Sequence, residues 1–216
     1  GRFHHAQSQL HRFLNCIGGY TRSKFTYSFA AAEAMVPHIL GSYRAYLDTC
    51  TSWDLIKNST KLFVCFGGVP LKNGQICQGG TGNHYQKESI ISAASSGIEF
   101  VNVSPLKSDL MDEAGGKWLS LRPNTDTALM LGIAHTLHIE GLSDKEFLNK
   151  YTEGFDIFLN YLLGFSDGIQ KDANWAAEIC DIPENEIREL ARRMVSNRTM
   201  ISVSWSLTRQ DHGEQP

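Results

Sequence analysis

The stretch LFVCFGG, residues 62–68, decides the fold predicted for this chain of 216 residues. Its first five residues are all apolar, with no polar residue alternating between them. A continuous apolar run of this length is typical of a strand that is covered on both faces, as in parallel sheets. The two glycines that follow end the run. The sequence therefore predicts a buried strand over residues 62–66.

Further strands and helices alternate on the carboxyl-terminal side of this strand. Short strand–helix–strand units favour a parallel sheet that helices cover on both faces. The expected fold class is α/β, with a parallel Rossmann-like sheet flanked by helices. The strands are expected at 98–103, 118–121 and 200–205, and the main helices at 88–96, 125–140 and 183–194.

The remaining segments are predicted to be mainly helical. Gly18 and Gly19 should stop the first helix, and Pro37 predicts a kink or an end near Val36. These helices are expected at 3–17, 29–40, 48–57, 143–151, 154–163 and 175–180, with Phe155, Phe158, Tyr161 and Phe165 as core packing residues. A boundary near 58–61 would divide the chain into residues 1–58 and residues 59–216.

Composition and charge narrow the class of protein. The net charge of −3 argues against a nucleic-acid binder, which is usually basic. No apolar run approaches the ~20 residues of a membrane-spanning helix. The chain starts at Gly1 without methionine or a signal peptide, so we expect a fragment of a longer protein. The five cysteines form no C-x-x-C pair and are expected to be reduced, mostly buried thiols. They favour the cytoplasm, with the periplasm as the alternative.

In a parallel sheet, ligands bind beyond the carboxyl ends of the strands. The segments just after the predicted strand ends are 67–72, 104–109 and 206–209. A second candidate is RPNTD, residues 122–126, because free amides at a helix start favour an anion. Asn124 or Thr125 would cap this helix, and Asp126 would lie at its positive end.

Other candidates have a simpler structural interpretation. Ser28 precedes a helix, where a serine usually caps free backbone N–H groups. His135 and His138 are three residues apart on one helix, but no third ligand completes a metal site. Gly79–Gly82 is a glycine-rich loop without a phosphate-binding motif, and we assign it no phosphate.

Six segments, in order along the whole chain, resemble the S-oxide and N-oxide reductases that carry bis-molybdopterin guanine dinucleotide. This family includes dimethyl sulfoxide, trimethylamine N-oxide and biotin sulfoxide reductases. The segments are FTYSFAAAEAMVPHILG (25–41), LKN (71–73), NVSPLKSD (102–109), RPNTDTALMLGIAHTL (122–137), NWAAEIC (174–180) and SWSLTRQDHGEQ (204–215). The resemblance implies that the chain is part of a larger multidomain molybdoenzyme. It also implies that residues 1–58 carry the molybdenum ligand and that residues 59–216 form a truncated guanine dinucleotide-binding domain.

The resemblance implies roles for individual residues. Ser28 would be the protein ligand of molybdenum, and Arg209 would lie near the substrate funnel. Asp126 would accept hydrogen bonds from a guanine edge. The other expected cofactor-binding residues are Lys72, Ser104, Pro105, Pro123, Asn124, Thr125, Trp205 and Ser206. Lys107, Ser108 and Asp109 would flank the pyrophosphate, and His212 and Gln215 would lie near the substrate funnel.

The implied activity is reduction of S-oxides or N-oxides by two-electron oxygen-atom transfer to molybdenum. Biotin sulfoxide, methionine sulfoxide and trimethylamine N-oxide are the small-molecule substrates considered, and anaerobic respiration is the implied setting. An external donor, either a cytochrome or a thiol- or NAD(P)H-linked reductant, would supply the electrons. The alternative is a non-redox α/β nucleotide-binding or regulatory domain, in which Ser28 is only a helix cap.

Overall fold

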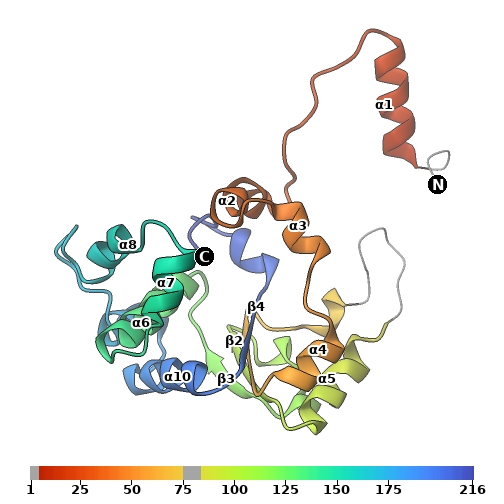
Figure 1. Ribbon diagram of the computed structural model, residues 1–216. Coiled ribbons are helices and arrows are strands. Elements are labelled where there is room, and N and C mark those ends of the chain that lie inside the picture. Colours follow the sequence, from red (N-terminus) through yellow and green to blue (C-terminus); the bar gives the residue numbers. More distant parts are fainter. Residues whose placement is uncertain (1–4, 75–83) are drawn as a thin grey trace.

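A four-stranded parallel sheet forms the centre of the computed structural model, which describes residues 5–74 and 84–216 (Figure 1). The strands lie in the order β3-β2-β1-β4, and every neighbouring pair is parallel. Their bounds are β1 Leu62–Phe66, β2 Glu99–Ser104, β3 Lys117–Ser120 and β4 Thr199–Val203. The predicted fold class is therefore confirmed.

Helices cover both faces of the sheet, which explains why β1 has no polar residue. Leu62, Val64 and Phe66 point into the core beneath α6 (Asp126–Ile139), α9 (Ala173–Cys180) and α10 (Glu184–Ser196). Phe63 and Cys65 point to the opposite core, under α4 (Trp53–Ser59) and α5 (Gln86–Ser95). Successive side chains of a strand alternate between faces, so burial on both sides requires a continuous apolar run.

The connections create a switch point between β1 and β4. The chain leaves β1 through α5 on one face and reaches β2. It leaves β3 through the helices on the other face and returns to β4, which pairs with the other side of β1. In sheets of this kind, ligands bind in the crevice where the two connections diverge.

Shorter elements complete the described part of the chain. In Figure 1, α1 stands away from the sheet on an extended segment, whereas α2 lies above it. The remaining helices are α1 Ala6–Cys16, α2 Ala30–Leu40, α3 Tyr43–Asp48, α7 Lys145–Tyr151 and α8 Phe155–Leu162. Single 3-10 turns are η2 Leu71–Asn73, η3 Lys107–Asp109, η4 Asp112–Ala114 and η5 Trp205–Thr208.

The predictions for the first helices are wrong in two respects. α2 runs through Pro37 to Leu40, so it does not end near Val36, and the alternative of a kink there stays a prediction. The last turn of α2 is complete, since the carbonyl of Pro37 accepts a hydrogen bond from the N–H of Gly41. The helix predicted over 48–57 is two helices, since α3 ends at Asp48 and α4 begins only at Trp53.

The predicted core role is also wrong for three of the four aromatic residues in and after α8, while Phe155 is half-buried. Phe158 and Tyr161 are 40% exposed and Phe165 is 77% exposed. α8 contacts α6, and Leu162 is its buried residue. A helix that packs through one narrow stripe leaves its other faces outside, even where they are apolar.

The thiols are less buried than expected. Cys65 and Cys180 are buried, but Cys16 and Cys50 are exposed. Cys77 and the loop Gly79–Gly82 lie outside the described residues. The described helices include none that is both long and apolar enough to cross a membrane. The proposed boundary near residue 58 stays a prediction.

Candidate functional site

Ser28 lies in the turn that leads into α2, and its hydroxyl does not cap the helix. Phe29 occupies the N-cap position, and no side chain makes the capping hydrogen bond. Within the described parts of the chain, the Ser28 hydroxyl has no hydrogen-bond partner. The turn is closed instead by Glu33, whose Oε2 accepts the backbone N–H of Thr26 at 3.0 Å. The structure therefore does not support the interpretation of Ser28 as a helix cap.

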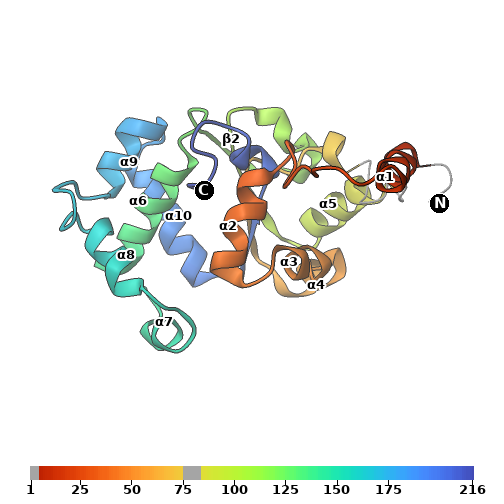
Figure 2. The ribbon, with the colours of Figure 1, turned by 90° about the horizontal axis from the view of Figure 1, so that it is seen from above.

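Residues that follow β4 hold this turn from the far end of the sequence. Nε of Arg209 donates to the main-chain carbonyl of Ser28 at 2.5 Å. The rings of Trp205 and Phe29 lie beside each other, with centroids 4.2 Å apart. Figures 1 and 2 show α2 next to the blue turn η5, in agreement with these contacts. The predicted metal ligand thus lies at the carboxyl end of β4.

Glycines after β1 allow the strand-end segments to approach closely. Gly67 and Gly68 have φ angles of 78° and 71°, which L-residues with side chains seldom adopt. A Cβ on Gly67 would lie 2.7 Å from the Cβ of Ser204. A Cβ on Gly68 would lie 2.5 Å from the Cβ of Asp109. Larger residues at these two positions would push the three loops apart.

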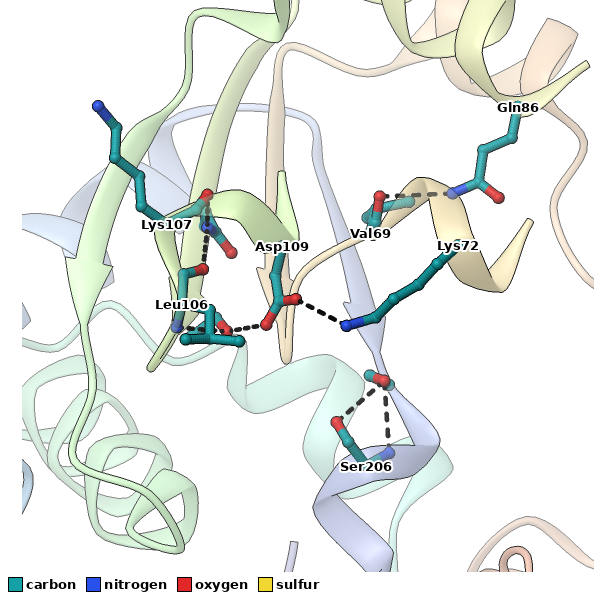
Figure 3. A network of polar contacts seen from close by, with 10 residues as sticks. Val69, Lys72, Gln86, Leu106, Lys107, Asp109 and Ser206 are labelled. Carbon is teal, nitrogen blue, oxygen red and sulfur yellow. Dashed lines mark hydrogen bonds and ion pairs between the residues drawn. The ribbon is translucent and has the colours of Figure 1, made fainter. Parts of the chain in front are cut away.

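A polar network joins the loops that follow β1 and β2 (Figure 3). The Ser104 hydroxyl donates to Asp109 Oδ2 at 2.6 Å and accepts the N–H of Leu106 at 3.3 Å. Nζ of Lys72 lies 3.8 Å from Asp109 Oδ1. Nδ2 of Asn102, on β2, donates to the carbonyls of Leu106 and Lys107. Ser104 therefore shapes its own turn, while the exposed Lys72 remains available to an anion.

An ion pair between Arg122 and Asp181 holds the RPNTD segment, residues 122–126. Arg122 donates two hydrogen bonds to Asp181, at 2.9 and 2.7 Å. Thr125 occupies the N-cap position of α6, but its hydroxyl donates to the carbonyl of Arg122 and does not cap the helix. Neither Asn124 nor Thr125 therefore makes the predicted side-chain cap. Asn124 has a left-handed φ of 65°, which turns the chain into the helix.

Asp126 is a buried carboxylate at the start of α6, only 6% exposed. Burial raises its pKa, because the charged form loses its hydration. The Gln210 side chain faces the Asp126 carboxylate and lowers its pKa, against the effect of burial. Nε2 of Gln210 is nevertheless buried without a well-formed hydrogen bond in the described part of the protein. Gln210, the residue after Arg209, therefore places the start of α6 beside the turn after β4. The sequence analysis did not predict this role of Gln210.

The structure gathers many of the predicted residues around the switch point. Ser28, Arg209, Trp205 and Ser206 meet beside β4, and Lys72 and Ser104 meet beyond β1 and β2. Pro105, Pro123 and Asn124 lie on exposed turns. His212 forms an ion pair with Glu214 when protonated, with 3.4 Å between Nδ1 and Oε1. Gln215 donates its N–H to the carbonyl of His212.

Among the described residues, no further side chains lie with the two histidines of α6 to complete a metal site. His135 is buried, with both ring nitrogens lacking a hydrogen-bond partner in the described structure. Among residues 5–74 and 84–216, no group of three or more His, Cys, Asp or Glu side chains is placed to hold a metal ion. A single protein ligand such as Ser28 would therefore need a cofactor to supply the other ligands.

The donor set fits a large polar cofactor. Asn102 Oδ1 and Gln210 Nε2 are buried atoms without partners in the described residues, one an acceptor and the other a donor. Asn102 lies on β2, and Gln210 lies in the turn after η5, next to Arg209. Fold and site together define an α/β domain whose strand-end loops meet at the switch point between β1 and β4, where domains of this class bind their cofactors.

Comparison with known proteins identifies the family. A protein-family model described as "Molybdopterin oxidoreductase" matches residues 1–216. The chain belongs to the molybdopterin oxidoreductase family, which implies a molybdenum–pterin cofactor. It is 41% identical over 215 residues to the dimethyl sulfoxide/trimethylamine N-oxide reductase of Cereibacter sphaeroides, covering 100% of this chain and 26% of the relative.

Two other relatives, also named as reductases of S-oxides or N-oxides, match the whole chain at a similar identity. The biotin sulfoxide reductase of Cereibacter sphaeroides is 42% identical over 216 residues, 100% of this chain and 29% of that protein. The trimethylamine-N-oxide reductase of Haemophilus influenzae is 39% identical over 218 residues, again 100% of this chain and 26% of the relative. The chain therefore spans little more than a quarter of the length of these proteins.

A solved structure supports the fold. The acetylene hydratase from Pelobacter acetylenicus aligns with a TM-score of 0.65 and 23% sequence identity. The alignment covers 94% of this chain and 25% of that chain. At this identity the similarity speaks for the fold alone.

Proposed function

We propose that this chain is the part of an S-oxide or N-oxide reductase that supplies the protein ligand of molybdenum and part of the cofactor-binding site. The observation that carries the proposal is the position of Ser28. Its hydroxyl is free of any capping role, yet its main chain is held against the ligand-facing end of the sheet. The relatives named as reductases of such oxides supply the reaction class.

The proposed cofactor is bis-molybdopterin guanine dinucleotide. When bound, it would supply two-electron oxygen-atom transfer, with electrons from an external donor. Ser28 would provide a hard oxygen ligand, which suits a high-valent metal. Lys72 would offer a cation to a pterin or a phosphate, because its Nζ is exposed beside Asp109 at the strand-end loops.

The guanine would lie near the start of α6. The Asp126 carboxylate can accept two N–H groups from the edge of a guanine. The Gln210 amide can donate to the guanine carbonyl, which would satisfy its unpartnered nitrogen. The Arg122–Asp181 pair would hold the preceding loop in place. Pro123, Asn124 and Thr125 would lie along the nucleotide, and Ser104 and Pro105 would border its diphosphate.

Replacement of Ser28 by alanine in the full-length enzyme tests this proposal. We expect Ser28→Ala to retain the pterins but to lose most oxide reduction, with an altered electron paramagnetic resonance signal of Mo(V). Ser92→Ala is the matched control, because Ser92 is exposed on α5, away from the site. Wild-type turnover with an unchanged Mo(V) signal in Ser28→Ala would refute the assignment.

A further inference from the structure

The turn that carries Ser28 has few anchors of its own. Tyr27 is fully exposed, and Phe25 holds a left-handed φ of 65°, which a bulky residue seldom adopts. The side-chain hydrogen bond that joins this turn to α2 runs from the N–H of Thr26 to Glu33. A metal ligand on such a turn needs support, because ligand positions must be held to within roughly 0.5 Å for function.

That support comes from the segment after β4. The guanidinium of Arg209 makes one hydrogen bond in the described structure, and the acceptor is the Ser28 carbonyl. The ring of Trp205 packs on Phe29, and Phe29 also contacts the ring of Tyr43 at 5.5 Å. One contact thus holds the main chain of Ser28, and the other holds the side chain of the next residue.

Because η5 follows β4 directly, it transmits the position of the sheet to the turn. Ser204 donates its N–H to the carbonyl of Phe66 at 2.9 Å, so the start of the segment is tied to β1. The Ser204 hydroxyl then accepts the N–H of Ser206. The guanidinium is a planar fork of donors, and this geometry makes Arg209 more rigid as a support than a lysine would be.

We propose that Arg209 is a positioning residue that fixes the main chain of Ser28, with the Phe29–Trp205 contact as its second point of support. This inference rests on the proposed function, in which Ser28 is the metal ligand. Within the described structure, the other N–H groups of the Arg209 guanidinium remain free for the substrate contact expected from the family resemblance. The two roles differ in their consequences. Loss of a substrate contact changes KM differently for different oxides, whereas loss of positioning lowers kcat for all of them and alters the metal signal.

The decisive experiment does not require the cofactor. Hydrogen–deuterium exchange would be followed for a peptide covering residues 25–33 in full-length enzyme prepared without molybdate. We expect exchange to be about two- to tenfold faster in Arg209→Ala, since the bond is exposed to solvent and a typical net hydrogen bond is worth roughly that factor. Arg209→Lys should recover part of the protection. Arg44→Ala is the matched control, because Arg44 is an exposed arginine on the adjacent α3.

Unchanged exchange in Arg209→Ala would overturn the proposal, whatever the activity of the loaded enzyme. In the loaded enzyme, we expect Arg209→Ala to alter the Mo(V) signal and to lower kcat by a similar factor for several sulfoxides and N-oxides. An effect confined to the KM of particular oxides would also overturn it. Failure of the metal assignment is recognised separately, by an unchanged Mo(V) signal in Ser28→Ala.

Discussion

Arg209 and Ser28 are 181 residues apart in sequence, yet Nε of Arg209 donates directly to the carbonyl of Ser28. The bond joins the turn before α2 to the turn after β4, across the switch point of the sheet. Two residues that the family resemblance assigned to the active site from distant parts of the sequence are therefore parts of one structural unit. The position of the predicted metal ligand therefore depends on the turn that follows β4.

Asp126→Asn should separate stability from cofactor binding. Burial raises the pKa of Asp126, so the folded state holds its proton more tightly than the unfolded state. Stability from this group is therefore lost as pH rises from the unfolded pKa of 3.8 through the folded pKa. At neutral pH the asparagine variant of the cofactor-free enzyme should melt at a higher temperature than wild type.

The same substitution should weaken guanine binding. Loss of a hydrogen bond to a charged group costs roughly 1.5–3 kcal/mol, which corresponds to about 10- to 100-fold in retention. Guanine content after dialysis would be measured in parallel with melting. Asp156→Asn serves as the control, because Asp156 is an exposed acid in the first turn of α8. Full guanine occupancy in Asp126→Asn would restrict Asp126 to a structural role.

Gly132→Val should destabilise the helical layer above the sheet. A Cβ at Gly132 would lie 2.7 Å from the Cβ of Ala176, so α6 and α9 could not keep their separation. Overpacking of this kind typically costs about 1–3 kcal/mol in the free energy of unfolding. Chemical denaturation of the intact enzyme measures it, and Gly132→Ala should fall between wild type and valine. Equal stability of all three forms would contradict the close packing.

His135 should make the protein sensitive to acid. Burial lowers its pKa, with further lowering from Arg188 and His138 and an opposing effect from Asp172. A histidine with a lowered folded pKa binds protons better when unfolded. Stability is therefore present above the unfolded pKa of 6.5 and is lost as pH falls below it toward the folded pKa.

His135→Leu removes this proton-binding difference. The loss of melting temperature between pH 7.5 and pH 5 should therefore be smaller in His135→Leu than in wild type. His84→Leu is a suitable control, because His84 is exposed before α5. An identical pH profile in wild type and His135→Leu would show that His135 does not titrate in this range.

Lys171 and Asp167 should respond unequally to substitution. Nζ of Lys171 donates to both carboxylate oxygens of Asp167, at 2.8 and 2.7 Å, and lies 4.2 Å from the ring centre of Tyr161. The lysine side chain is 3% exposed, whereas that of Asp167 is 37% exposed. Asp167→Asn leaves a buried cation without its counterion, while Lys171→Met leaves only an exposed carboxylate. Asp167→Asn should therefore lower the melting temperature more, and the reverse order would contradict this account.

The sheet could be predicted because its signals are local. The apolar run 62–66 matches β1 at both ends, and the other three predicted strands differ from β2, β3 and β4 by only one or two residues at each end. Burial on both faces leaves a continuous apolar pattern that needs no tertiary information. The carboxyl ends of parallel strands meet at one edge, so the predicted ligand loops are also found together.

What could not be predicted depends on tertiary contacts. The apolar pattern of α8 does not reveal that its buried contact would be confined largely to Leu162. Pro37 is tolerated in α2 although its local preference is to break a helix. Nothing near Gln210 in the sequence shows that it would face Asp126, 84 positions earlier, because such pairings follow from the crossover of the chain between β3 and β4.

The contact of Arg209 with Ser28 also orders events during synthesis. A ribosome that adds roughly 5–20 residues per second needs about 10 to 40 s to proceed from Ser28 to Arg209. Throughout that interval the turn before α2 can be complete in sequence but lacks its clamp. A nascent chain released before residue 209 would therefore carry an unsupported Ser28, and under the proposed function the cofactor would meet a positioned ligand only after β4 and Arg209 have been made.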